Sequence, residues 1–176
     1  MAELNATAAS LLGFLHAGPM TGWDLLATAQ QRIGGFWSLT RSQVYRELTA
    51  MAAAGLVEAG AREKRDRQPF AITPAGREAF AAWVRTQPSG ETIRFPLLLT
   101  VAFGDHLDRA TLDALLADQR GYHERRHADY LARRDEVAPF ADRWSLATLD
   151  FGIRHEQAIL DWFAALPDLL PPTPGG

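Results

Sequence analysis

Hydrophobic residues in the first half of the chain recur at spacings of three and four in several segments, and alternate in two others. The first pattern predicts helices, because residues three or four apart share one helix face, and the second predicts strands. Capping and turn residues separate the segments. The predicted elements are helices over residues 8–16, 22–33 and 41–54, strands over 56–59 and 70–73, and a helix from 74 through 83.

The third helical segment has two faces of different character. Val44, Leu48 and Met51 recur at spacings of four and three, which predicts a face packed on a core. Thr40 and Gln43 fit a capping box, in which the hydroxyl accepts a backbone N–H and the amide reaches back. An ordinary amphipathic surface helix would show the same pattern. The residues suited to contacting DNA are Thr40, Arg41, Ser42, Gln43, Tyr45 and Arg46.

The segment that follows favours a DNA-binding fold. Gly55 ends the helix, and residues 62–67 form a charged turn between the two predicted strands. Three helices, two strands and a further helix are the order of a winged helix-turn-helix, whose third helix enters the major groove. The wing residues that we expect to contact DNA are Lys64, Arg65 and Arg67.

The second half of the chain is predicted to be helical. Residues 87–90 are a turn-rich linker, and helical patterns follow over residues 107–137 and 144–166. The last pattern is apolar on more than one side, as in a helix that covers a partner, although a core helix of one domain would look the same. The residues that we expect at a dimer interface are Leu146, Leu149, Ile153, Leu160 and Phe163.

We therefore predict a mainly α-helical protein with a small β-hairpin, in three parts. Residues 1–86 form a winged helix-turn-helix DNA-binding domain, residues 91–166 a helical dimerisation domain, and residues 167–176 a disordered, proline-rich tail. The chain has no cysteine, and its most apolar stretch spans nine residues, about half of a membrane span. We expect a cytoplasmic protein that makes no contact with membranes.

Six short motifs follow one another in the first half of the chain: residues 11–15, 18–25, 36–39, 43–45, 55–57 and 72–76. In this order they resemble the PadR family of transcriptional regulators, and residues 95–105 and 149–156 resemble the C-terminal domain of its longer members. The resemblance implies a homodimeric DNA-binding regulator, usually a repressor, with an inducer that shifts the spacing of its recognition helices. The wing departs from the family pattern, because it lacks the Gly-Arg and paired tyrosines often found there.

Charge is unevenly distributed along the chain. The net charge is −3 and the isoelectric point about 5.9, which argues mildly against nucleic-acid binding. Residues 1–85 hold nine Arg or Lys against seven Asp or Glu, whereas residues 86–176 hold nine against fourteen. Since phosphate attraction acts over about 8–10 Å, basic groups of the third helix and wing can bind DNA while the acidic half stays outside the contact. We expect few phosphate contacts per protomer and dependence on two half-sites.

Residues 123–127 read His-Glu-x-x-His, the spacing by which zinc proteases place two ligands on one helix face. Arg125 and Arg126 fill the middle of the motif and are predicted to be solvated cations, which disfavour a bound metal. No nucleophile motif or phosphate-binding loop occurs, so we expect no enzymatic activity, no metal and no cofactor. Two alternatives stay open: a metal-dependent enzyme using His123 and His127, and a protein-interaction adaptor on a winged-helix scaffold.

A dimer would place its third helices in successive major grooves of a pseudo-palindromic operator, about 34–36 Å apart. Gln43 would pair with adenine and Arg41 or Arg46 with guanine, whereas Ser42 and Tyr45 would touch phosphate or a thymine methyl. The partners that we expect are therefore double-stranded DNA, a second copy of the chain and a small planar effector. Aromatic residues in a domain this small are more often core than ligand site. The candidates for stacking on the effector are Trp23, Trp37, Trp144 and Trp162.

Overall fold

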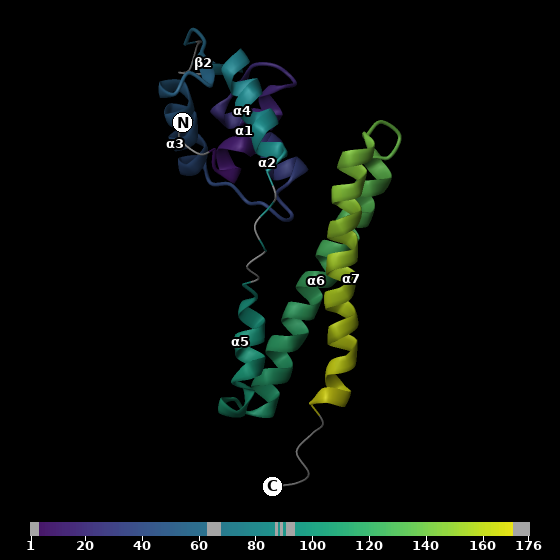
Figure 1. Cartoon of the computed structure of the whole chain (residues 1–176). Coiled ribbons are helices and arrows are strands. Elements are labelled where there is room, and N and C mark those ends of the chain that lie inside the picture. Colours follow the sequence, from purple (N-terminus) through teal and green to yellow (C-terminus); the bar gives the residue numbers. More distant parts are fainter. Residues whose placement is uncertain (1–3, 63–67, 87, 89, 91–93, 171–176) are drawn as a thin grey trace. The chain divides into compact units, whose positions relative to one another are not determined.

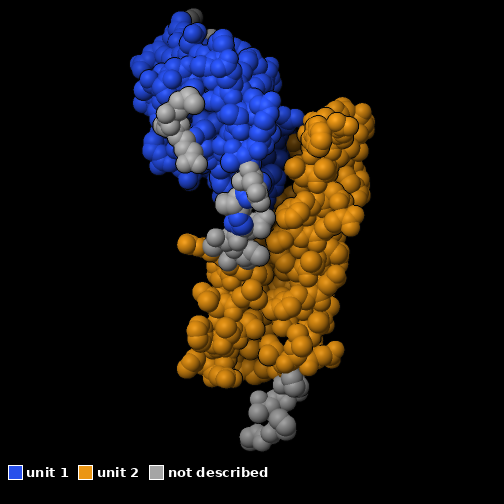
Figure 2. Space-filling view, viewed as in Figure 1, with its two compact units in different colours: residues 1–90 blue, residues 91–176 orange. Residues whose placement is uncertain are grey.

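The computed structural model describes residues 4–62, 68–86, 88, 90 and 94–170. The chain divides into two compact units, residues 1–90 and 91–176, which Figure 2 distinguishes by colour. The described chain is mainly helical with one small antiparallel sheet, as the sequence predicts (Figure 1). No helix within it is long and apolar enough to cross a membrane.

The first unit is assembled around helix α1 (Ala6–Leu15), which packs against α2 (Gly22–Arg32), α3 (Arg41–Ala53) and α4 (Pro74–Val84) (Figure 1). The helical spacing of the apolar residues brings them to one shared core. Trp23 of α2 is an exception: its side chain is exposed, whereas Leu25 is buried. The buried core consists of Ala8, Leu11, Leu12, Leu15, Leu25, Ala29, Leu39, Val44, Leu48, Met51, Val57 and Phe70.

Side-chain caps set where the helices of the first unit begin. Thr21 and Thr40 each form a capping box at the start of α2 and α3, and the sequence predicts the box at Thr40. Thr73 caps α4 through the backbone N–H of Gly76. Gly55 follows α3 with a φ of 70°, a left-handed conformation that glycine adopts without a Cβ clash. The predicted caps and this helix stop are confirmed.

Three short strands form the wing of the first unit. Strands β2 (Val57–Ala59) and β3 (Pro69–Ile72) pair antiparallel, with Val57 opposite Ile72. A third strand, β1 (Met20–Thr21), pairs with the other edge of β3 and gives the order β1-β3-β2. The sequence did not predict β1, because two residues are too short to show alternation. The fold is a winged helix-turn-helix, and the predicted fold class is confirmed.

The second unit is a helical hairpin with a shorter helix beside it. Helix α6 (Arg109–Val137) packs along α7 (Arg143–Leu169), and α5 (Pro96–Ala102) precedes a 3₁₀ turn at Gly104–His106 (Figure 1). The buried apolar cluster of this unit consists of Leu97, Phe163 and Leu166, with partly buried neighbours around it.

Two predicted boundaries in the second unit are wrong. One is a break at Gly121, suggested by the glycine within residues 107–137: helix α6 continues through it, because a single glycine in a long helix costs only about 1 kcal/mol. Helix α7 contains Pro167 and ends at Leu169, so the predicted tail starts too early. The last turn persists because the N–H of Leu170 still donates to the carbonyl of Leu166 at 2.8 Å. The remaining predicted tail, residues 171–176, lies outside the described residues.

Candidate nucleic-acid interface

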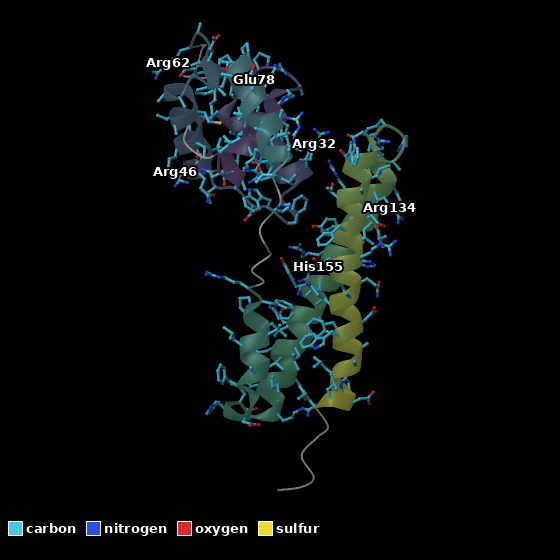
Figure 3. All side chains as sticks on the ribbon, viewed as in Figure 1. Arg32, Arg46, Arg62, Glu78, Arg134 and His155 are labelled. Atoms are coloured by element: carbon cyan, nitrogen blue, oxygen red, sulfur yellow. The ribbon has the colours of Figure 1, made fainter. Side chains whose placement is uncertain are left out.

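Helix α3 presents its polar side chains on the face opposite the core. Val44, Leu48 and Met51 are buried and hold the helix against α1 and α2. The outward face is basic and rich in hydroxyl groups, and Arg46 lies at the edge of the unit (Figure 3). The exposed residues at and along the helix are Thr40, Arg41, Ser42, Tyr45, Arg46 and Thr49.

Gln43 is half-buried and serves the helix start rather than pointing outward. Its Oε1 accepts hydrogen bonds from the backbone N–H of Thr40 at 2.8 Å and from the Thr40 hydroxyl at 3.0 Å. The Thr40 Oγ1 in turn accepts from the backbone N–H of Gln43 at 3.2 Å. A bidentate pair with adenine needs both the oxygen and the nitrogen of the amide. The predicted cap is therefore confirmed, and it competes with the predicted contact of Gln43 with adenine.

Tyr45 is packed beside Arg41 and over the start of α2. The Arg41 guanidinium lies 5.5 Å from the centre of the Tyr45 ring, a cation–π contact. A Cβ on Gly22 would come within 2.8 Å of the same ring, so the ring keeps this place only while residue 22 is glycine. These two contacts set the position of Tyr45 on the outward face of the helix.

Arg46 is held by an acidic neighbour that the sequence did not single out. Its Nη2 and Nε lie 3.0 and 3.3 Å from Oε1 of Glu47, whose other oxygen accepts from Asn5 at 3.0 Å. Glu47 is 8% exposed, although its position next to Arg46 would have suggested a solvated pair. The only signal in the sequence is that Glu47 lies three residues after Val44 and four before Met51, on the core side.

The predicted wing contacts, Lys64, Arg65 and Arg67, lie outside the described residues. On the described side of this turn, Arg62 is exposed at the end of the hairpin (Figure 3). Strands β2 and β3 hold the two ends of residues 60–68 together, since the N–H of Gly60 donates to the carbonyl of Pro69 at 2.8 Å. The described residues on both sides of the charged turn are therefore held together by the small sheet.

The His-Glu-x-x-His segment contributes to a buried ionic network in the second unit. Nδ1 of His123 lies 2.6 Å from Oε2 of Glu156, and Nε of Arg126 lies 2.8 Å from its Oε1. Burial opposes the charge of Arg126, but its hydrogen bond to Tyr122 and the charge of Glu156 outweigh burial and raise its pKa. Arg126 is therefore a partner of a buried carboxylate, not the solvated cation that the sequence predicts. Within the described chain, no three His, Asp or Glu side chains are grouped to hold a metal.

Comparison with known families separates the chain into the same two halves. Residues 11–82 match the family described as "Transcriptional regulator PadR-like family", and residues 93–170 match the family described as "Virulence activator alpha C-term". Residues 11–82 therefore form a domain of the PadR-like family. It is 26% identical over 169 residues to the "Negative transcriptional regulator PadR" of Bacillus subtilis, covering 89% of this chain and 93% of that protein.

Solved structures of PadR-like proteins share the fold. A PadR-like regulator from Bacillus cereus aligns with a TM-score of 0.82 at 20% identity, over 93% of this chain and 97% of that one. Bacillus subtilis PadR in complex with operator DNA aligns with a TM-score of 0.80 at 20% identity and the same coverage. The same protein in complex with p-coumaric acid aligns at 0.74 and 20% identity, over 96% of this chain and 99% of that one.

The PadR-like chain buries part of its predicted dimer interface inside the second unit. Ile153 and Phe163 are 9% and 5% exposed, so they pack α7 within the unit and offer little surface to a partner, and their contact with a partner stays a prediction. Leu146, Leu149 and Leu160 are half-buried. A helix that is apolar on several sides does not reveal which side its own unit covers. The large apolar residues that this unit exposes are Leu98, Leu99, Phe103, Leu115, Tyr122, Phe140, Trp144, Phe151 and Leu169.

The four tryptophans predicted to stack on an effector belong to different units. Trp23 and Trp37 are exposed in the first unit. Trp144 is exposed in the second, with the Arg143 guanidinium 4.5 Å from its ring centre, and Trp162 packs against Phe163 at 5.0 Å. A groove of about 200 Å³ in the second unit is lined by none of the four. Neither unit alone thus gathers them into one aromatic pocket.

Proposed function

We propose that this PadR-like protein is a homodimeric repressor that binds a pseudo-palindromic operator through α3 and responds to a small planar effector. The observation that carries the proposal is the outward face of α3, which exposes Arg41, Ser42, Tyr45 and Arg46 on a winged helix-turn-helix. This helix is the element that enters the major groove in such folds. A protein that binds genomic DNA in this way would act in the cytoplasm.

Arg46 and Arg41 are the groups best suited to base contacts. An arginine donates two parallel hydrogen bonds to O6 and N7 of guanine, and each good pair is worth about 1–3 kcal/mol of discrimination. Gln43 would contribute through the geometry of the helix start, because its oxygen is engaged by Thr40. Lys64, Arg65 and Arg67 of the wing would add contacts to the phosphate backbone or the minor groove.

Structures of a relative support the proposed binding of both DNA and a planar effector. Bacillus subtilis PadR has been solved in complex with operator DNA and in complex with p-coumaric acid. An effector regulates DNA binding only if it has different affinities for the states that bind and release the operator. A planar ligand of this kind, bound by the dimer, would shift the spacing of the two α3 helices.

The experiment is a selection of duplexes from a random-sequence library by the full-length protein, followed by mobility-shift titration at two salt concentrations. We expect an enriched pseudo-palindrome and an affinity that falls as salt rises, because bound phosphates release counterions. Arg46→Ala should weaken binding to the selected duplex by about 1–3 kcal/mol. Arg77→Ala removes an equal charge from exposed α4 and should leave affinity nearly unchanged.

The same experiment and a metal analysis of the purified protein separate the alternatives. An adaptor on a winged-helix scaffold would enrich no sequence and show no salt-dependent DNA binding. A metal-dependent enzyme using His123 and His127 would carry stoichiometric metal after purification. Membership in a family of regulators argues against the enzyme, and so does the pairing of His123 with Glu156.

A further inference from the structure

Glu47 is a buried carboxylate directly behind the DNA-facing surface of α3. Its side chain is 10% exposed, whereas that of its partner Arg46 is 68% exposed. Both carboxylate oxygens are engaged: Oε1 by the Nε and Nη2 of Arg46, and Oε2 by the Nδ2 of Asn5. A carboxylate left buried without partners would carry a large desolvation penalty, so these contacts determine how Glu47 is oriented.

Asn5 links this carboxylate to the start of another helix. Its Oδ1 accepts the backbone N–H of Ala8 at 2.9 Å and thereby caps α1, while its Nδ2 donates to Glu47 at 3.0 Å. The Asn5 amide therefore caps the start of α1 and also fixes Glu47 of α3, 42 positions later in the chain. Asn5 is exposed, but as the N-cap of α1 it ties Glu47 to the start of the helix that packs against α2, α3 and α4.

This anchoring matters for Arg46 because the arginine is otherwise a long, exposed side chain. Immobilising such a side chain on binding costs about 0.5–1.5 kcal/mol of conformational entropy. The guanidinium has five N–H donors in a fixed plane, and the contacts with Glu47 engage two of them along one edge. Three donors are left for a base edge, and the plane in which they lie is set before DNA arrives.

We propose that Glu47 is a positioning residue for operator recognition: it orients the Arg46 guanidinium for reading one base pair, and Asn5 holds Glu47 in place. The proposal rests on the proposed function, because it assigns a role within DNA binding by α3. It predicts that losing Glu47 impairs discrimination at the base pair read by Arg46, through Arg46 alone.

The test is a double-mutant cycle on the full-length protein. The variants are Glu47→Gln, Arg46→Ala and their combination, titrated against the duplex selected by the wild-type protein and against single base-pair substitutions of it. We expect Glu47→Gln to reduce discrimination roughly tenfold at one base pair per half-site and little elsewhere. In the Arg46→Ala background, Glu47→Gln should have no further effect at that base pair.

Two matched variants separate positioning from folding. Glu78→Gln makes the same change on the exposed face of α4 and should leave discrimination unchanged (Figure 3). Asn5→Ser keeps a side-chain cap for α1 but removes the donor to Glu47, so it should lower discrimination at the same base pair. Circular dichroism and urea unfolding of every variant report the folded state.

The outcomes are distinct. Equal losses from Glu47→Gln in the wild-type and Arg46→Ala backgrounds, or a loss spread over all base pairs, would show a merely structural role and overturn the proposal. Unchanged discrimination in a folded Glu47→Gln protein would overturn it as well. If the wild-type protein selects no sequence, the proposed function itself fails, and the role of Glu47 fails with it.

Discussion

At the start and outward face of α3, a side chain can either cap the helix backbone or contact the proposed DNA partner. Thr40 and Gln43 satisfy the backbone at the helix start, and Arg41, Tyr45 and Arg46 remain on the exposed side. Capping stabilises the helix by about 1 kcal/mol, which is comparable to one base contact. A side chain that caps the helix would have to give up the cap to contact a base. We therefore assign the base contacts to the arginines.

Gly22 provides a test of this face that does not change any charge. In Gly22→Ala the added Cβ would approach the Tyr45 ring to 2.8 Å, so the ring must move away from its place beside Arg41. We expect the affinity for the selected duplex to fall about two- to fivefold, the worth of one exposed cation–π contact. Mobility-shift titration measures this loss.

The control for this variant is Gly90→Ala, where a Cβ would meet nothing within 4 Å. Both variants should unfold in urea within about 0.5 kcal/mol of the wild-type protein, since Tyr45 is an exposed side chain free to shift. Unchanged DNA affinity in Gly22→Ala would show that the position of Tyr45 is irrelevant to binding.

Among the elements, the α6–α7 hairpin depends on a polar network as well as on apolar contacts. Glu156 of α7 is 1% exposed and pairs with His123 and Arg126 of α6. Nε2 of His123 is buried without a hydrogen-bond partner among the described residues, so the network is only partly satisfied. Such a network stabilises weakly as a whole, yet removing one partner leaves the others buried and unpaired.

Glu156→Ala should therefore lower the free energy of unfolding by about 3–5 kcal/mol, the range measured for broken buried pairs. Glu124→Ala is the matched control, because Glu124 forms an exposed pair with Arg120 and such pairs are worth about 0–1 kcal/mol. Urea unfolding followed by circular dichroism measures both. Equal losses in the two variants would mean that burial of Glu156 does not matter for the hairpin.

The same elements show how far sequence patterns reach. Helices α2, α3 and α4 start where the sequence predicts, because each capping side chain binds a backbone N–H no more than three residues away. Strand β1 was missed because only its pairing with β3 defines it. The role of Glu156 was missed because its partners are 30 and 33 residues away. A local pattern contains no information about such pairings.

For the whole molecule, the exposed apolar residues of the second unit are the best guide to assembly. Leu99 and Phe103, on or next to α5, are 64% and 62% exposed. Exposed apolar residues that gather in one region mark interaction surfaces in many proteins. The proposed homodimer would bury such residues, and it would not need Ile153 or Phe163, which already pack within the unit.

The double variant Leu99→Glu/Phe103→Glu should raise the dimer dissociation constant at least about tenfold, because charge at an apolar interface is costly to bury. Sedimentation equilibrium measures this change. Ile153→Ala should instead cost about 2–5 kcal/mol of unfolding free energy and leave dimerisation of the folded protein nearly unchanged. A double variant that stays as dimeric as the wild type would place the interface elsewhere.

The helices, their caps and the outward side of α3 could be inferred from residues three or four positions apart, and the family resemblance from six short motifs in order. This is possible because helix hydrogen bonds, caps and amphipathic faces are local interactions. The anchoring of Arg46 through Glu47 to Asn5, and the burial of Ile153 and Phe163, depend on packing between distant segments. Burial and partner choice are properties of the folded chain, because they arise only when those segments meet.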